Sequence, residues 1–342
     1  MSNCNKTVIF FAAICGTLLA VPPGTATEAY KGFKLDFYPQ SKPKRVLPFT
    51  RNFSLGEILL ADSPDQEVDT MLKGAARGTI TVPPGKFVTF VPSHHFFEDP
   101  ERGKVIPADG LDCLKVAVAS MDDAEDGWCD RAMGYAGRFK SLIKLDLDRS
   151  DCTDKGLSHA GDLPNLQAIS AFAAMIEGDC FKQLNKLKKL RFLFLQDNPI
   201  KQENLRYLET LPQLQYLYLG GTSIDDEGVR LISKCSQLVR LDLGGNRKIT
   251  NLSVKYLLGL KNLRVLVLSG TSITSDGVLQ LSTLPLVFLN LPGGRYTKEQ
   301  IKAFHEAFPV AFPEGYPAAS MVPSKETHKV DSDTRFLLGP LH

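Results

Sequence analysis

Cysteine, net charge and catalytic motifs are all scarce in this 342-residue chain. Its 7 cysteines are too few for the disulfide framework of a small secreted domain. Its formal net charge of +2 offers no basic footprint, which argues against a nucleic-acid partner. The sequence contains no G-x-S-x-G element, phosphate-binding loop, dinucleotide fingerprint or Cys/His nucleophile pair. We therefore predict a protein that is not an enzyme and that needs no cofactor.

Long apolar runs are confined to the N-terminus. The run TVIFFAAICGTLLAV follows Lys6 and precedes PPGTA, which places the small residues Gly24 and Ala26 before a cleavage point. This pattern is typical of a secretory signal peptide over residues 1–26. The run is short for a spanning helix, although an uncleaved N-terminal anchor stays the alternative. We expect a secreted, periplasmic or cell-envelope protein that does not insert in a membrane once the signal is removed.

Leucine recurs with a nearly constant period. In each period an L-x-x-L-x-L pattern ends in the alternation of a short strand, and apolar residues every three positions then suit one face of a short helix. A strand-turn-helix unit of this kind cannot bury both apolar faces unless similar units stack on it. The first leucine of the pattern stands at Leu142, Leu166, Leu190, Leu214, Leu238, Leu263 and Leu286, in steps of 24, 24, 24, 24, 25 and 23 residues.

The register L-x-x-L-x-L-x-x-[T/N]-x-I-x-[D/S]-x-G-[L/V]-x-x-L resembles a leucine-rich repeat. It is similar to the ribonuclease-inhibitor-like and cysteine-containing types, with repeats of about 24 residues, that occur in secreted bacterial proteins. The resemblance implies an α/β solenoid, a horseshoe with a parallel sheet inside and helices outside, in which residues 142–310 form seven repeats. In this family a Thr or Asn after the strand bonds to backbone at a tight turn. This chain has Ser150, Asn198, Thr222, Asn246 and Thr271 at that position, but Ala174 and Gly294 in the two turns that we expect to be less regular.

The segments outside the repeats are less periodic. Residues 30–105 are predicted to form a small β-rich domain, in which Thr79–Val82 and Phe87–Val91 make a hairpin around a Pro-Pro-Gly turn. Residues 110–141 are predicted to be a degenerate capping repeat, since an end repeat has one face in solvent. Residues 311–342 lose the period and are predicted to be an extended or disordered tail.

The strand alternation predicts which side chains line the inner curve of the solenoid. Residues between the core leucines should point away from the helices, and on two neighbouring strands these residues are aromatic. A contiguous, exposed aromatic surface beside an arginine is typical of a binding interface. The predicted partner-binding set is Phe172, Phe192, Phe194, Tyr216, Tyr218, Arg240, Asp242, Val265, Val267 and Phe288.

Three interpretations of this aromatic surface stay open. In the first it binds a partner, in the second it only stabilises the sheet through cross-strand pairs, and in the third the chain covers it with RFLLGPL of the tail or with part of the β-rich domain. We predict a non-enzymatic, exported recognition module whose partner is a protein or peptide, or else a glycan. The alternatives are an enzyme whose active site lies in the N-terminal β-rich domain while the repeats present substrate, and a structural component of the cell envelope.

Two groups of residues could carry other chemistry. His94, His95 and Glu98 in SHHFFEDPE are ligand types for a metal, but their spacing matches no metal motif, so we predict a polar loop and no metal site. Asp146 and Asp148 are predicted to lie on a solvated face, with Lys144 as their charge partner.

The cysteines and helix starts give finer expectations. Cys152 and Cys235 occupy core positions of the repeats and should be buried thiols. Cys113 and Cys129, in the capping segment, could form a disulfide or stay free, because spacing does not fix connectivity. The predicted helix N-caps are Asp154, Asp226 and Ser275.

Overall fold

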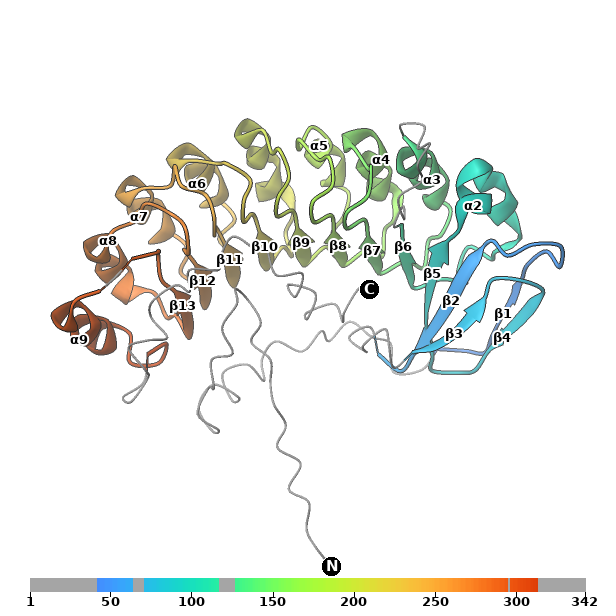
Figure 1. Cartoon of the computed structure of the whole chain (residues 1–342), viewed down its shortest axis with the longest axis horizontal. Coiled ribbons are helices and arrows are strands. Elements are labelled where there is room, and N and C mark those ends of the chain that lie inside the picture. The colour runs from blue at the N-terminus through green and yellow to red at the C-terminus, as the bar shows by residue number, and fades with distance from the viewer. Residues whose placement is uncertain (1–41, 64–70, 117–126, 295, 313–342) are drawn as a thin grey trace, which may run out of the picture.

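The chain forms a curved α/β solenoid whose inner wall is one long sheet (Figure 1). The computed structural model describes residues 42–63, 71–116, 127–294 and 296–312. The 11-stranded sheet has the order β13-β12-β11-β10-β9-β8-β7-β6-β5-β2-β3, and neighbouring strands from β5 to β13 are parallel. Consecutive parallel strands joined by helical crossovers confirm the leucine-rich repeat solenoid that the leucine period predicts.

The repeats supply short strands of equal length. The strands are β1 (Arg45–Pro48), β2 (Gly56–Ala61), β3 (Leu72–Ala75), β4 (Thr79–Val82), β5 (Phe87–Pro92), β6 (Cys113–Lys115), β7 (Lys144–Asp146), β8 (Ala168–Ser170), β9 (Phe192–Phe194), β10 (Tyr216–Tyr218), β11 (Arg240–Asp242), β12 (Val265–Val267) and β13 (Phe288–Asn290). From β6 onward each strand has three residues, and its middle residue is an apolar core residue.

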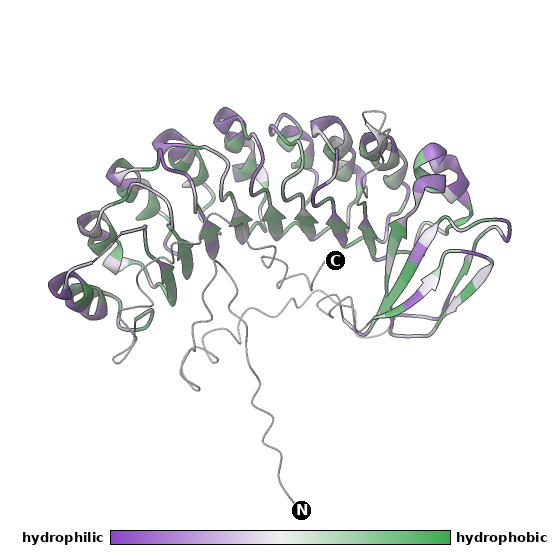
Figure 2. Cartoon of the chain, in the orientation of Figure 1, coloured by the Kyte–Doolittle hydropathy of each residue, from purple (hydrophilic) through white to green (hydrophobic). Residues whose placement is uncertain are grey.

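Short helices form the outer wall, and Figure 2 shows hydrophilic residues on their outward sides. Some of them are α-helical and others have 3-10 geometry. The helices are α2 (His94–Glu98), η3 (Pro100–Val105), α3 (Trp128–Ala136), α4 (Asp154–Ser158), η4 (His159–Asp162), α5 (Phe181–Leu184), η5 (Gln202–Thr210), α6 (Asp226–Ile232), η6 (Asn251–Ser253), α7 (Val254–Leu257), α8 (Ser275–Gln280), η7 (Leu281–Thr283) and α9 (Lys298–Ala307). Within the described residues, none of these helices has the length and apolar character needed to cross a membrane.

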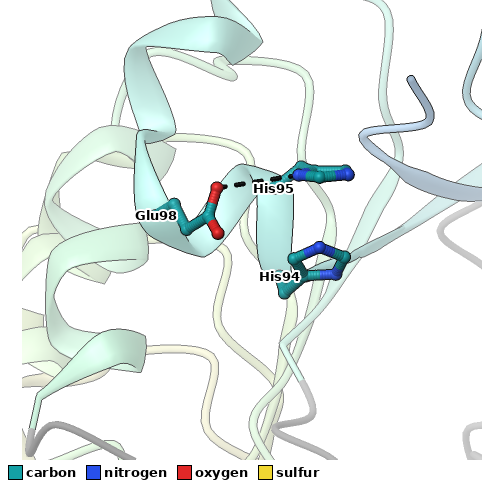
Figure 3. Close-up of side chains that lie close together, drawn as sticks. All are labelled: His94, His95 and Glu98. Carbon is teal, nitrogen blue, oxygen red and sulfur yellow. Dashed lines mark ion pairs between the residues drawn. The ribbon is translucent and has the colours of Figure 1, made fainter.

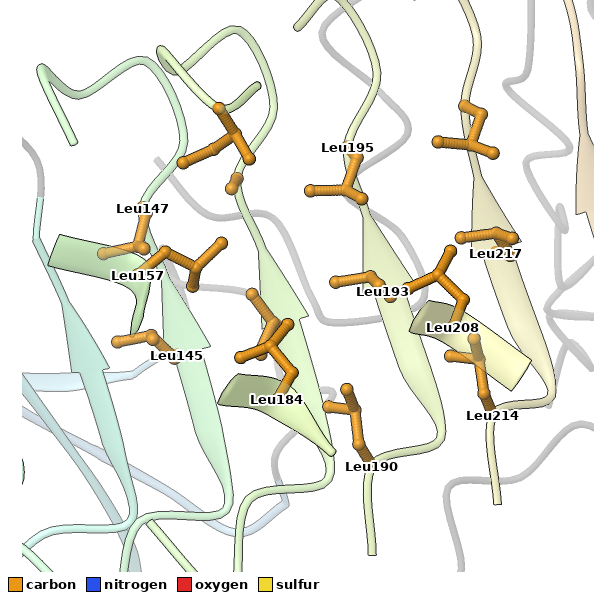
Figure 4. Close-up of a cluster of buried hydrophobic side chains, with 14 of the residues drawn as sticks. Leu145, Leu147, Leu157, Leu184, Leu190, Leu193, Leu195, Leu208, Leu214 and Leu217 are labelled. Carbon is orange, nitrogen blue, oxygen red and sulfur yellow. The ribbon is translucent and has the colours of Figure 1, made fainter. Parts of the chain in front are cut away.

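Leucine side chains fill the space between the sheet and the outer helices (Figure 4). Leu145, Leu193 and Leu217 point into this core from the middle of their strands, and each is 0% exposed. Leu157 and Leu208 meet them from the helical side and are also fully buried. Burying one leucine completely contributes about 1.5–3 kcal/mol, so the stacked rows are the main source of the solenoid's stability.

Asparagine side chains at two of the tight turns tie their repeats to the repeats before them. The Asn198 side-chain amide donates to the carbonyls of Ala171 (2.6 Å) and Leu195 (3.0 Å), and its oxygen accepts from the Ile176 N–H (3.1 Å). Asn246, two repeats further along the chain, makes equivalent bonds and donates to the Leu219 carbonyl at 2.7 Å. These bonds confirm the role that the family resemblance implies, because they satisfy buried backbone groups that no ladder reaches.

The N-caps lie one residue earlier than predicted. The capping side chains are Thr153, Asp225 and Thr274. The carboxylate of Asp154, which we predicted to be a cap, instead accepts from the N–H groups of Glu177 (2.8 Å), Gly178 (3.0 Å) and Cys180 (2.9 Å) in the following repeat. The prediction was wrong because the residue next to the cap faces the neighbouring repeat and can satisfy donors there, which a single-repeat pattern cannot reveal.

Asp226 and Ser275 were also predicted to be N-caps, and these predictions were wrong. Like Asp154, both side chains form hydrogen bonds with the following repeat. Asp226 accepts from the Thr250 N–H (2.9 Å) and hydroxyl (2.7 Å) and from the Ser253 hydroxyl. The Gln300 amide of the last helix donates to the Ser275 hydroxyl at 2.8 Å. These side chains therefore join successive helices along the outer wall.

The N-terminal strands extend the sheet of the repeats. β5 pairs in parallel with β6, with Thr89 opposite Cys113, and pairs antiparallel with β2 on its other side. The predicted hairpin was wrong, because β4 pairs with β1 in a separate two-stranded sheet instead of with β5. The two strands have nearly the predicted bounds, but β5 is buried along most of its length and so requires a neighbour on each side.

The stretch SHHFFEDPE is helical instead of a loop, which corrects a second prediction. It forms α2 and the start of η3 because Phe96 and Phe97 are drawn into the core and are 0% and 3% exposed. The Phe96 ring meets those of Phe90 and Tyr135 edge-on, at centroid distances of 5.5 and 6.0 Å. Aromatic burial on one side of a single turn therefore outweighs the polar composition of the segment.

The last described residues differ from the predicted start of the C-terminal tail. Ala311 and Phe312, predicted to belong to the tail, are buried against the last helix, where the Phe312 ring lies 6.2 Å from that of Phe308. Residues 313–342 and the predicted signal peptide lie outside the described residues. The segment of the predicted capping repeat supplies β6 and α3.

Candidate interaction face

The inner face of the sheet carries two rows of side chains in the predicted register. Phe192 pairs with Tyr216 and Phe194 with Tyr218 across β9 and β10. The rings stack, with centroids 4.3 Å apart in the first pair and 4.2 Å in the second, at interplanar angles of 14° and 24°. We call these four residues the aromatic block. The Arg240 guanidinium lies over the Tyr218 ring at 4.9 Å, so the predicted cluster is spatially contiguous.

The aromatic block is buried, and our prediction that it is exposed was wrong. Phe192, Phe194 and Tyr218 are 0%, 3% and 1% exposed. Face-to-face stacking and the guanidinium groups of Arg240 and Arg191, the latter 5.5 Å from the Phe192 ring, account for part of this burial. Figure 1 shows the helices on the opposite side of the sheet. Strand alternation predicts the side of the sheet to which a side chain points. It does not predict whether neighbouring side chains or other segments cover that side chain.

Arg240, on this face, has a buried guanidinium with two unsatisfied nitrogens. The residue is 5% exposed, and its Nε and Nη2 have no hydrogen-bond partner among the described residues. Beside it, Asp242 is also 5% exposed and accepts from the Gly244 N–H at 2.9 Å. Burial raises the pKa of Asp242, whereas the nearby Arg240 charge lowers it. A buried donor without an acceptor costs about 1–3 kcal/mol, so an incoming acceptor would be favourable here.

The rest of the predicted set continues the face toward the C-terminal end. Val265 and Val267 are 0% and 1% exposed, and Phe288 is partly buried. At the other side of the aromatic block, Phe172 is partly buried under the Arg149 guanidinium, which is 5.5 Å from its ring. The structure therefore places the whole predicted set on one continuous surface.

The first strands of the repeats carry charges on the same face. Lys115, Lys144 and Asp146 are 8%, 2% and 1% exposed, and the Lys115 ammonium lies 3.1 Å from the Asp146 carboxylate. Together with Asp148 we call them the charged end. The predicted solvated face was wrong here, because these side chains are held among neighbouring strands, and Asp146 forms a buried ion pair with Lys115.

Asp148 is the most perturbed acid of the charged end. Burial, followed by the nearby Asp146 charge, raises its pKa to about 6. Its carboxylate accepts from the Ser170 hydroxyl at 2.5 Å and from the Phe172 N–H at 2.8 Å, and both bonds lower the pKa. Desolvation therefore outweighs the hydrogen bonds.

Of the two states left open for Cys113 and Cys129, the structure has the free thiols, and both residues are buried. Cys113 packs on the inner face with Phe87 and Ile143, while Cys129 lies in the main core on the other side of the sheet. Burial raises the pKa of the Cys113 thiol to about 11. The prediction of buried core thiols is confirmed for Cys152 and Cys235.

The sequence-based set missed two residues of this face. Arg191 precedes β9 and covers Phe192, and its guanidinium donates to the Gln215 side chain at 3.1 Å. Gln196 follows β9 by two positions and is 7% exposed. Extending the strand alternation two positions past Phe194 would have found Gln196, whereas the alternation does not mark Arg191, which is adjacent to Phe192 and reaches its ring through a long side chain.

Two groups of potential metal ligands lie outside this face. His94, His95 and Glu98 each bring one ligand atom within 4.8 Å of the others (Figure 3). Asp154, Glu177 and Asp179 do the same. In the second group Asp154 accepts hydrogen bonds from backbone, and Lys201 forms ion pairs with the two other carboxylates, so each carboxylate already has a partner within the chain.

Comparison with known proteins adds little to this description. No protein-family model matches the sequence, and no curated protein matches it. Among solved structures, the chain is similar to an internalin (inlF) from Listeria monocytogenes, with 18% identity, a TM-score of 0.39, and coverage of 54% of this chain and 62% of the internalin. It is also similar to internalin C2 (inlC2) from the same organism, with 20% identity, a TM-score of 0.39, and coverage of 54% and 82%. The sheet order and the repeats define the fold of this chain.

Proposed function

We propose that this chain is an exported, non-enzymatic recognition module that binds a protein or peptide on the inner face of its solenoid. The observation that carries the proposal is the Arg240 guanidinium, buried beside the aromatic block with Nε and Nη2 unsatisfied. Aromatic and arginine side chains in desolvated surroundings are the residues that contribute most to protein interfaces. Export rests on the predicted signal peptide.

The chemistry of the face suggests the kind of segment that binds. A carboxylate, either a side chain or a chain end, would accept from the two free nitrogens of Arg240, and such charge-assisted bonds are stronger than neutral ones. The aromatic block and the Val265–Val267 strand would contact apolar side chains of the same segment. Because the sheet is already ordered, little conformational entropy is lost on binding.

Burial of the aromatic block sets a condition on this proposal. A partner can reach these rings only where the inner face is open, so covering by another part of the chain stays the competing interpretation. Removing residues 313–342 tests it. If the cover is the tail, the truncated chain should show increased tyrosine fluorescence quenching by acrylamide and lower solubility. If both properties are unchanged, the tail does not cover the face.

Affinity capture from the exported fraction tests binding itself. We expect the Phe194→Ala/Tyr218→Ala variant to lose capture, while a matched aromatic substitution on the outer helices, Tyr256→Ala, keeps it. Tyr256 is partly buried against the core from the helical side. Both variants need a cooperative thermal transition before the comparison counts. Unchanged capture by the double variant would reject this surface, and recovery of a polysaccharide instead of a protein would change the class of partner to a glycan.

A further inference from the structure

The helical conformation of α2 brings three metal-ligand side chains together. His94 and Glu98 are four residues apart, which places them on one side of a helix, one turn from each other. His95 lies between them, and its Nδ1 is 3.6 Å from a Glu98 oxygen (Figure 3). Phe96 and Phe97 occupy the opposite, buried side of the turn. The core therefore fixes the orientation of the helix and directs the three polar side chains outward together.

The distances suit a small divalent cation. Two imidazoles and one carboxylate are a common donor set for Zn²⁺, with metal–ligand distances of about 2.0–2.2 Å. Ligand atoms around a tetrahedral ion are then about 3.3 Å apart. The 3.6 Å separation between His95 and Glu98 is already close to that value, and all three ligand atoms are within 4.8 Å of one another. The half-exposed side chains can close the remaining distance by rotation.

Arg102 is the main competitor for Glu98. Its Nη1 lies 3.1 Å from the Glu98 carboxylate and donates a hydrogen bond to it. The guanidinium has other partners, however, donating to the His95 carbonyl at 2.9 Å and lying 3.5 Å from Asp99. It also stacks over the Phe53 ring at 5.3 Å. Arg102 can therefore stay in place when Glu98 turns toward a cation.

We propose that His94, His95 and Glu98 form a binding site for one Zn²⁺-class divalent cation on the outer side of α2. The site leaves a fourth coordination position to water. The buried thiols do not compete, since the five described cysteines are all buried and burial raises their pKa values.

Isothermal titration of zinc chloride into the tag-free full chain tests this proposal. We expect saturable binding of one ion per chain and a higher melting temperature with zinc, because an ion that binds only the folded state stabilises it. His94→Gln and Glu98→Gln should each weaken binding about tenfold or more. Arg102→Gln should strengthen it several-fold, because it removes a nearby positive charge.

The control variants are His159→Gln, at a half-buried histidine on η4, and Glu177→Gln in the second carboxylate group, and both should bind zinc like the unmodified chain. The proposal is overturned if no one-to-one binding is seen, or if His94→Gln and Glu98→Gln bind with unchanged affinity. It is equally overturned if Glu177→Gln alone removes binding. Melting temperatures without zinc show whether each variant is folded, so a loss of binding in a folded variant is decisive.

Discussion

The charged end and the aromatic block occupy the same backbone framework but stabilise it differently. Both lie on three-residue parallel strands in the same register. At the charged end, Lys115 and Asp146 neutralise each other in a buried setting, whereas in the aromatic block the rings stack without charge. Removing one charged partner leaves a buried ion, but removing one ring leaves only a gap. The repeat backbone therefore accommodates either a buried ion pair or stacked rings. The loss of stability on substitution should differ between the two.

Breaking the ion pair of the charged end should have the largest effect. Lys115→Met removes the ammonium group that pairs with the buried Asp146, and we expect the free energy of unfolding to fall by about 3 kcal/mol or more. Urea denaturation at pH 7.5 measures this change. Lys115→Met combined with Asp146→Leu should recover most of the loss, because both charges are then absent. A single variant as stable as the original chain would mean that the pair does not hold this end together.

Removing the perturbed acid should stabilise the charged end. The folded-state pKa of Asp148, about 6, lies above the usual value of about 3.9. Between about pH 4 and 6 the unfolded chain loses this proton while the folded chain keeps it, so stability falls as pH rises. Asp148→Asn should therefore raise the free energy of unfolding by about 1–2 kcal/mol at pH 7.5.

The same variant supplies its own control. The Asn oxygen can still accept from Ser170 and Phe172, so the hydrogen bonds of this position are kept. At pH 3.5 the carboxyl group is protonated in both states, and the two chains should be equally stable. Urea denaturation at both pH values tests this, and an equal gain at pH 3.5 would show that charge is not the cause.

The smallest change in stability is expected beside the aromatic block. Arg240→Met keeps the length of the side chain but removes the unsatisfied nitrogens, so the free energy of unfolding should stay within about 1 kcal/mol of the original. Partner capture, in contrast, should fall at least tenfold if Arg240 donates to a carboxylate. Lys298→Met, on the last helix, is the matched control. If stability falls by several kcal/mol while capture survives, Arg240 is a structural residue.

The repeats were predictable to the level of single strands. In each repeat, the strand is centred on the second apolar position of the L-x-x-L-x-L pattern. The turn residues Asn198 and Asn246 make the backbone bonds that the resemblance implies. The predictions were wrong where a residue interacts with another part of the chain. Asp154 was assigned to its own helix, and β4 was paired with its neighbour in sequence, but both have partners elsewhere.

The sequence by itself determined the solenoid, because each repeat packs only on the repeats beside it and the leucine period records that contact directly. It also determined which residues line the inner face, since strand alternation is a local property. Only the tertiary structure decided that the aromatic block is buried, that Cys113 and Cys129 lie on opposite sides of the sheet, and that SHHFFEDPE is a helix. These features depend on the packing of segments far apart in the chain, and no local pattern encodes such packing.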